Sequence, residues 1–227
     1  MTDVSGLFAL MDAWRHLPAY QLERRADVFF ALYLRDFVAQ KTGIDFDSRI
    51  VPEFPIKRDL IWPEKPGSSS VKADYLLVSR DAEHALLVEL KTDSGSRRDQ
   101  QDTYLDRAQQ LGMQPLLQGV ADIIRATSAH RKYFHLACLL RDLGLLSLPT
   151  GYRDHLFPSI KTGLSTLLTE VKPSAASPRL AVLYIQPQPG PAAIGFEEFA
   201  SFVESRPGDL PRVFAAHLRR WQLPAGS

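Results

Sequence analysis

Hydrophobic positions recur along the chain at spacings that predict alternating helices and strands. Residues 21–40 carry apolar side chains at helical spacing, and Gly43 is placed to end that helix. Residues 71–78 and 85–91 read instead as two strands, joined by a polar connector short enough for a hairpin. Residues 48–61 read as a strand pair or one bent strand, with Pro52 and Pro55 favouring a sheet edge or a bulge. The apolar positions of the first helix are Ala26, Phe30, Tyr33, Leu34 and Phe37.

The second half of the chain is predominantly helical by the same criterion. A continuous apolar run over residues 179–185 predicts a buried strand that returns to the sheet. A strand over Tyr133–Leu140 is an alternative to the helix predicted there. The predicted helices span residues 97–110, 114–127, 131–143, 153–171, 196–204 and 209–221. We therefore expect one α/β domain over residues 1–227, with a small mixed sheet, its core at about 21–110 and 179–187, a helical insertion at about 113–172 and C-terminal helices at about 196–221.

Three charged residues of the predicted hairpin converge on one face. If the hairpin is symmetric about Asp81 and Ala82, Asp74 lies opposite Glu89. Opposed side chains share a face, with Cβ atoms about 4.5–5.5 Å apart. Strand alternation places Lys91 on the face of Glu89.

Two opposed carboxylates destabilise a sheet unless a positive charge lies between them. Mg²⁺ suits this position because it prefers hard oxygen ligands and is often held by one or two carboxylates. Lys91 would then orient an attacking water or stabilise a developing negative charge. The alternative is an exposed hairpin face on which the carboxylates pair with Lys72 and Lys91. We favour the metal site.

With Asp74 followed by Glu89-Leu90-Lys91, the chain resembles the PD-(D/E)XK nuclease superfamily. Ala73 stands where the motif name has proline, a position at which the superfamily is permissive. Gln100 and Tyr104 resemble the Q-x-x-x-Y element of RecB-like members. The predicted lead helix, hairpin and following helix are similar to the α-β-β-β-α-β core of that superfamily, which has a restriction-endonuclease-like fold.

The resemblance implies a role for each matching residue. Asp74 and Glu89 would bind Mg²⁺ or Mn²⁺, helped by the Leu90 main-chain carbonyl, and Lys91 would position the attacking water. Glu23 would add a carboxylate from the first helix, as the superfamily often does. Gln100 and Tyr104 would support the site or the substrate. Arg97 joins them as a candidate for a different reason: it lies one turn before Gln100 on a helix predicted to leave directly from the site.

Several of these residues also have simpler explanations. Glu23 lies on the apolar side of its helix, but a carboxylate in the first turn is also favoured by the helix dipole. Tyr104 would equally pack against the sheet from an ordinary polar helix. Glu53 is an alternative acidic contributor. Six histidines occur, and none has metal-ligand spacing, since His130 and His135 share a helix face poorly.

Composition restricts the function further. The net charge is +1, so binding of nucleic acid would need a local basic patch. The single cysteine, Cys138, excludes an internal disulfide and a four-cysteine iron–sulfur cluster, and we expect it to be a small buried residue. No apolar stretch approaches the ~20 residues of a membrane span, and no signal-type segment opens the chain, so a cytoplasmic location is expected.

The sequence thus predicts a metal-dependent nuclease that hydrolyses phosphodiester bonds, with DNA favoured over RNA as the substrate. A homodimer or a protein complex is compatible with this prediction. The competing hypothesis is a non-catalytic binding module with the nuclease fold, acting as a subunit of a repair or defence complex. A third hypothesis is a structural protein with a charged hairpin, which would leave Asp74 and Glu89 exposed and insensitive to Mg²⁺.

Overall fold

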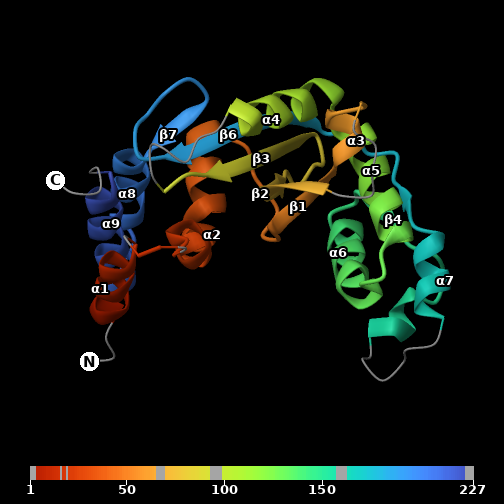
Figure 1. Ribbon diagram of the computed structural model, residues 1–227, viewed down its shortest axis with the longest axis horizontal. Coiled ribbons are helices and arrows are strands. Elements are labelled where there is room, and N and C mark those ends of the chain that lie inside the picture. The colour runs from red at the N-terminus through yellow and green to blue at the C-terminus, as the bar shows by residue number, and fades with distance from the viewer. Residues whose placement is uncertain are drawn as a thin grey trace. The chain divides into compact units, whose positions relative to one another are not determined.

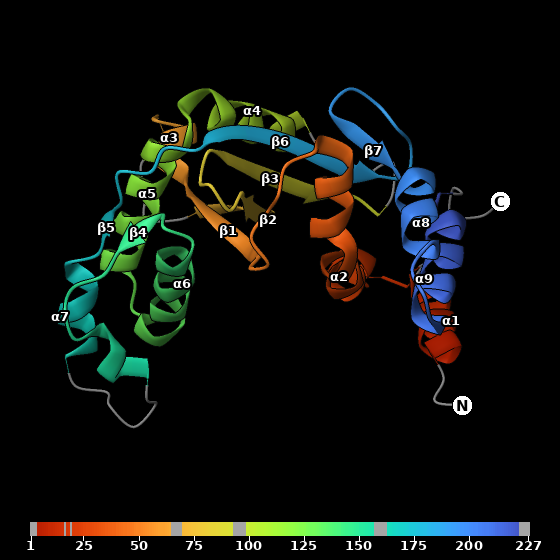
Figure 2. The ribbon, with the colours of Figure 1, turned by 180° about the vertical axis from the view of Figure 1, so that it is seen from behind.

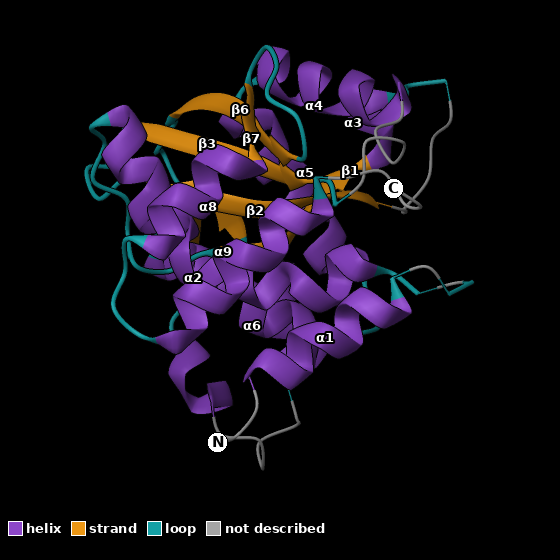
Figure 3. Cartoon of the chain, turned by 90° about the vertical axis from the view of Figure 1, so that its left-hand side faces the viewer, coloured by secondary structure: helices purple, strands orange, loops and turns teal. Residues whose placement is uncertain are grey.

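The protein is a mixed α/β structure with a five-stranded sheet flanked by helices (Figure 3). The strand order is β1-β2-β3-β6-β7. The computed structural model describes residues 4–15, 17–18, 20–64, 70–92, 99–156 and 163–222, with only the backbone described for residues 99–102. The expected α/β class and mixed sheet are confirmed.

The chain divides into two compact units. Unit 1 comprises Met1–Ile44, Val88–Asp102 and Leu183–Ser227, and unit 2 comprises Asp45–Leu87 and Thr103–Val182. Both units contain part of the sheet, because β3 (His84–Leu90) and β6 (Arg179–Gln186) each begin in unit 2 and end in unit 1.

In unit 2, β1 (Val51–Lys57) forms the edge of the sheet and pairs antiparallel with β2 (Ser70–Val78). The prolines Pro52 and Pro55 predicted this edge position because they lack the N–H that a ladder needs. Glu53, between Pro52 and Phe54, has a left-handed backbone with φ of 51°. The four-residue helix α3 (Arg58–Ile61) follows β1, so residues 48–61 hold one strand and not a strand pair.

The hairpin turn lies where the sequence places it. The Ser79 N–H donates to the His84 carbonyl at 2.9 Å, which makes Asp81 and Ala82 the centre of the connection. Ala82 has φ of 57°, and its N–H donates to the Ser79 carbonyl at 2.9 Å. This hydrogen bonding confirms the predicted start of the hairpin register within unit 2. Continued without a bulge, the register pairs Asp74 with Glu89, which stays a prediction.

The last strands make the sheet mixed. Within unit 2 the Arg179 N–H donates to the Glu83 carbonyl, and within unit 1 the Lys91 N–H donates to the Ile185 carbonyl at 2.9 Å. The chain therefore advances in the same direction along β3 and β6. The short strand β7 (Ala193–Gly195) pairs parallel with the end of β6. The predicted returning strand over residues 179–185 is thus confirmed.

The helices of unit 1 enclose an aromatic core. They are α1 (Val4–Trp14), α2 (Leu22–Thr42), α8 (Phe196–Glu204) and α9 (Asp209–Trp221). Figures 1 and 2 both show α1, α8 and α9 side by side. Phe30 of α2 stacks on Phe199 with ring centroids 5.4 Å apart, and Phe8 of α1 stacks on Phe214 with ring centroids 5.6 Å apart. Gly43 ends α2 with φ of 72°, as the sequence predicts.

Most of the remaining helices belong to unit 2. α5 (Met113–Ala126) and α6 (His130–Asp142) pack on β1, and these two helices and α7 (Leu164–Thr169) pack on one another. Unit 2 also holds most of α4 (Asp99–Leu111), together with η1 (Tyr152–Leu156) and the two-stranded sheet of β4 (Leu146–Ser147) and β5 (Lys172–Pro173). Figure 2 shows α5, α6 and α7 grouped together. Cys138 is buried in α6, as expected, and this helix replaces the alternative strand at Tyr133–Leu140.

The long helix predicted over residues 153–171 is wrong. The structure has the short 3-10 helix η1 at Tyr152–Leu156 and the six-residue α7 at Leu164–Thr169. Gly163 precedes α7 with φ of 80°, a left-handed conformation that interrupts an α-helix. The apolar periodicity of the segment therefore belongs to two short elements.

A carboxylate of α1 and a histidine of α9 lie in contact within unit 1. The Asp12 carboxylate accepts a hydrogen bond from Trp221 Nε1 at 2.7 Å and lies 2.8 Å from His217 Nδ1 and 3.5 Å from Arg220. Burial lowers the pKa of His217 below its ordinary value of 6.5, and the Asp12 carboxylate offsets this only in part. The folded protein therefore favours neutral His217.

We expect acid to destabilise the protein through His217. Because the folded state binds this proton less readily than the unfolded state, the stabilisation is complete above pH 6.5 and is lost as the pH falls towards the lowered pKa. Urea unfolding between about pH 7.5 and about pH 5.5 should show a smaller loss of stability for His217→Gln than for the wild type. The exposed His135→Gln is the matched control, and equal pH dependence of all three proteins would refute the assignment.

None of the described helices has the length and apolar character needed to cross a membrane.

Candidate functional site

The candidate site is built at the end of β3, where the chain leaves the sheet. Glu89 and Lys91 are two residues apart, so strand alternation places both side chains on one face. Both are only 2% exposed, although glutamate and lysine are rarely buried unless they are paired. The Lys91 Nζ donates to Glu89 Oε1 at 2.8 Å and to the Leu90 carbonyl at 2.7 Å.

Glu23 completes the site within unit 1. It lies in the first turn of α2, and its Oε2 is 3.8 Å from the Lys91 Nζ. Its side chain is 30% exposed, whereas Lys91 is enclosed. Glu23 therefore occupies a first turn, where the helix dipole favours a carboxylate, and its carboxylate also lies near the charged pair. Its expected role as a metal ligand stays a prediction.

The buried Glu89 differs from the solvated hairpin face that the sequence left open. Glu89 does pair with Lys91, as that alternative proposed, but both are inside the protein. Removing two charges from water carries a penalty that the ion pair and the bond to the Leu90 carbonyl must offset. A buried ionic network at a strand end is therefore a candidate for function as well as for structure.

Asp74 lies in unit 2, half-buried on β2. Its predicted position opposite Glu89 rests on the hairpin register described above. Glu53, the alternative acidic residue, pairs through its Oε2 with the Lys72 ammonium at 2.7 Å, and both side chains are exposed. Phe54 pairs with Ala73 and Pro52 with Tyr75, so the backbone of Glu53 lies beside Asp74 while its carboxylate points to Lys72.

Tyr104 supports the strand that carries Asp74. The ring is 5% exposed, and the hydroxyl donates to the Lys72 carbonyl of β2 at 3.0 Å, both within unit 2. The alternative in which Tyr104 packs against the sheet is therefore confirmed. Arg97 and the side chain of Gln100 lie outside the described residues.

We predict that Tyr104→Phe lowers the free energy of unfolding by about 1 kcal/mol, because the part-buried hydrogen bond from the hydroxyl to the Lys72 carbonyl is lost. Urea unfolding of the variant and of the wild type measures this effect. Tyr133→Phe, in half-buried surroundings on α6, is the control, and a Tyr104→Phe protein equal to the wild type would assign the hydroxyl no role.

One group of acidic and histidine side chains that the sequence analysis did not single out lies at the hairpin turn. Asp81, Glu83 and His84 have ligand atoms within 4.8 Å of one another. Asp81 already accepts hydrogen bonds from the Ser79 hydroxyl and the Glu83 N–H, which lower the pKa of its carboxyl. These bonds explain the arrangement as the internal bonding of a tight turn, so we assign no cation to it.

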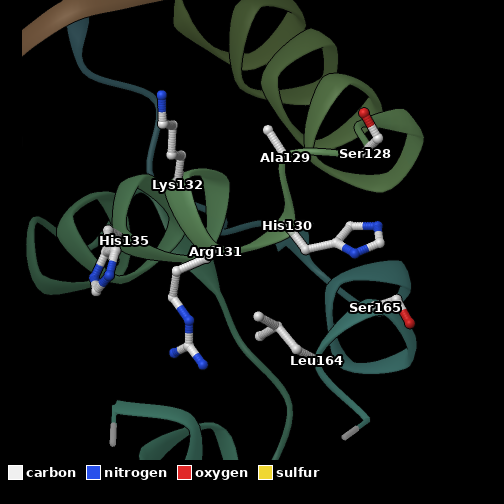
Figure 4. Close-up of a pocket in the computed structure, with 8 residues that line it drawn as sticks. All are labelled: Ser128, Ala129, His130, Arg131, Lys132, His135, Leu164 and Ser165. Carbon is white, nitrogen blue, oxygen red and sulfur yellow. The ribbon is translucent and has the colours of Figure 1, made fainter. Parts of the chain in front are cut away.

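A basic pocket lies within unit 2, with a volume of about 610 Å³ (Figure 4). Among the described residues that line it none is acidic, and half of them come from the first two turns of α6. The Arg131 guanidinium donates to the His155 carbonyl, while His130, Lys132 and His135 carry the remaining basic groups. Figure 4 shows Lys132 and His130 directed to different sides. The lining residues are Ser128, Ala129, His130, Arg131, Lys132, His135, Leu164 and Ser165.

This pocket was missed by sequence reasoning, which weighed His130 and His135 only as metal ligands. The signal was the consecutive run His130-Arg131-Lys132, a local basic cluster that a net charge of +1 conceals. The helix also begins without a side-chain cap at Ala129. The pocket therefore provides local positive charge for an anionic group.

No family model, curated protein or solved structure matches this chain.

Proposed function

We propose that the protein is a metal-dependent nuclease of the PD-(D/E)XK superfamily that hydrolyses phosphodiester bonds of DNA. The observation that carries the proposal is the buried arrangement of Glu89, the Leu90 carbonyl and Lys91 at the end of β3. Acidic and basic groups in this order, at the end of the second strand of a hairpin, match the motif of the superfamily.

The order of elements supports the same proposal. A helix, three strands, a further helix and a returning strand follow one another as α2, β1, β2, β3, α4 and β6. This is the α-β-β-β-α-β order of a restriction-endonuclease-like core, and α5, α6 and α7 form an insertion before β6. The four strands of this core are also neighbours in the sheet, in the order β1-β2-β3-β6.

The residues present fit a hard divalent cation. Glu89 Oε1 and the Leu90 carbonyl oxygen already converge on one positive charge, the Lys91 ammonium. Carboxylate and carbonyl oxygens are the ligands that Mg²⁺ and Mn²⁺ take, and Glu23 would add a further carboxylate. The hairpin register expected from the sequence would add Asp74. When bound, such an ion supplies Lewis acidity at the phosphoryl group and a more acidic water.

The protein's own groups would then perform the remaining steps. Asp74 and Glu89 would hold the ion, and Lys91 would orient the attacking water or stabilise charge that develops on the phosphoryl oxygens. The basic pocket of unit 2 gives a chain of net charge +1 a local surface for phosphate groups.

The experiment that tests the proposal is a cleavage assay on single- and double-stranded DNA and RNA, with Mg²⁺, Mn²⁺ or EDTA. Wild type should cut DNA only when a divalent ion is present, and Glu89→Gln should not cut. Lys41→Met is the matched control, because Lys41 pairs with Glu198 on the exposed side of α2 in the same unit. Cleavage of RNA but not of DNA would show that RNA is the substrate. Folded wild type that neither binds these ions nor cuts any nucleic acid would refute the proposal.

One observation favours the non-catalytic alternative, a binding module. Lys91 already neutralises Glu89, so the pair is satisfied in the absence of any ion. A binding module would not cut nucleic acid, and its binding of a partner or nucleic acid would survive Asp74→Asn and Lys91→Ala.

We predict that Glu23→Gln weakens Mn²⁺ binding and slows cleavage without abolishing either, because Glu23 lies 3.8 Å from Lys91 and is partly exposed. Titration of the metal-free protein with Mn²⁺ and initial cleavage rates measure the two effects. Asp36→Asn, on the exposed side of α2, is the control. If both quantities equal those of the wild type, Glu23 contributes only to the helix.

A further inference from the structure

The Lys91 ammonium contacts the same oxygens of unit 1 that would hold the proposed metal ion. Its Nζ lies 2.8 Å from Glu89 Oε1 and 2.7 Å from the Leu90 carbonyl oxygen, so it contacts both of the unit 1 oxygens assigned to the ion. The side chain is 2% exposed, so this contact is an enclosed arrangement and not one of many surface conformations. Two positive charges held by the same pair of oxygens would repel each other strongly in such surroundings.

We propose that Lys91 is an internal cation that competes with the divalent ion for Glu89 and the Leu90 carbonyl. The inference rests on the proposed function, because it assumes that these two oxygens bind the ion. In the metal-free protein Lys91 neutralises a carboxylate that burial would otherwise make costly. For the ion to bind, the Lys91 ammonium must leave both oxygens.

Glu23 is placed to receive the displaced ammonium. Its Oε2 lies 3.8 Å from the Lys91 Nζ, further than Glu89 Oε1, and its side chain is 30% exposed. A short rotation of the Lys91 side chain towards Glu23 keeps the ammonium paired and frees the first two oxygens. Glu23 thereby gains a function that does not require it to be a metal ligand.

Direct titration of metal-free protein with Mn²⁺ tests this competition without using catalysis. Lys91→Met keeps an unbranched side chain but removes the charge, and it should bind Mn²⁺ at least about tenfold more tightly than wild type. Lys41→Met removes a charge from an exposed pair in the same unit and should bind Mn²⁺ like wild type. Mn²⁺ should also raise the melting temperature of Lys91→Met by more than that of wild type.

A second pair of variants separates the two roles of Glu23. If Glu23 receives the ammonium, Glu23→Gln weakens Mn²⁺ binding in wild type but has no effect when Lys91 is methionine. If Glu23 is a metal ligand, the loss is the same in both backgrounds, and Glu23 is then not the acceptor of the displaced ammonium. This comparison is a double-mutant cycle on one measured affinity.

The failure of this inference is distinguishable from failure of the proposed function. Wild type that binds Mn²⁺, with Lys91→Met binding no more tightly, overturns the competition and leaves the metal site intact. Wild type and Lys91→Met that both fail to bind overturn the proposed site as well. If Lys91→Met does not fold, Lys91→Gln replaces it: this side chain is neutral but keeps N–H donors for both oxygens, and an affinity no greater than that of wild type contradicts the proposal.

Discussion

Replacing Glu89 with alanine is expected to abolish cleavage and to lower the free energy of unfolding by about 3–5 kcal/mol. The stability loss arises because the Lys91 ammonium, 2% exposed, would lose the carboxylate that lies 2.8 Å away. The Leu90 carbonyl and the more distant Glu23 would remain as its partners. Urea unfolding in the presence of EDTA measures the free energy of unfolding without a contribution from any bound ion.

An exposed pair in the same unit provides the comparison for Glu89. Glu198→Ala removes the carboxylate that pairs with Lys41 at the surface, and such pairs contribute about 0–1 kcal/mol. The double variant Glu89→Leu with Lys91→Met should recover most of the lost stability, because apolar groups replace both charges. A Glu89→Ala protein that is no less stable than Glu198→Ala would contradict the burial argument.

Asp74→Asn should reduce cleavage at least about a hundredfold and leave the free energy of unfolding unchanged or slightly higher. Asparagine keeps the size of the side chain but removes the charge, which the predicted register places opposite Glu89. Because Lys91 already neutralises Glu89, relief of repulsion should be small. Initial cleavage rates and urea unfolding, measured on the same preparation, separate the two quantities.

The control for Asp74 lies in the same hairpin. Asp81→Asn alters the acidic cluster of the turn and should retain cleavage. If Asp81→Asn abolishes cleavage and Asp74→Asn does not, the ion belongs to the turn. If Asp74→Asn instead destabilises the protein, its carboxylate is a structural partner and not a ligand.

Local patterns were sufficient for much of the fold. Alternation and a polar connector predicted β2, β3 and a turn centred on Asp81 and Ala82, and the Ser79–His84 hydrogen bond confirms that turn. The helical spacing of apolar residues predicted α2, and Gly43 predicted where it ends. These features depend on neighbouring residues, so a single sequence contains enough information to define them.

Other features depend on tertiary packing and were not predictable. Helix α1 has apolar side chains on its exposed side as well as its buried side, so it lacks the one-sided periodicity that marks a helix. Leu7 and Leu10 are exposed, whereas Phe8 and Met11 are buried. For the candidate site, spacing predicted that Glu89 and Lys91 share a face, but not that both are enclosed or that Lys91 also contacts the Leu90 carbonyl.

The edge strand β1 has a consequence for how copies of this chain meet. Pro52 and Pro55 offer no N–H to an incoming strand, and the left-handed backbone of Glu53 departs from the extended path that a new ladder would follow. The charged Glu53–Lys72 pair is exposed on the same two strands. A second chain therefore cannot readily extend the sheet from β1, which protects this edge against strand-to-strand aggregation while the protein folds.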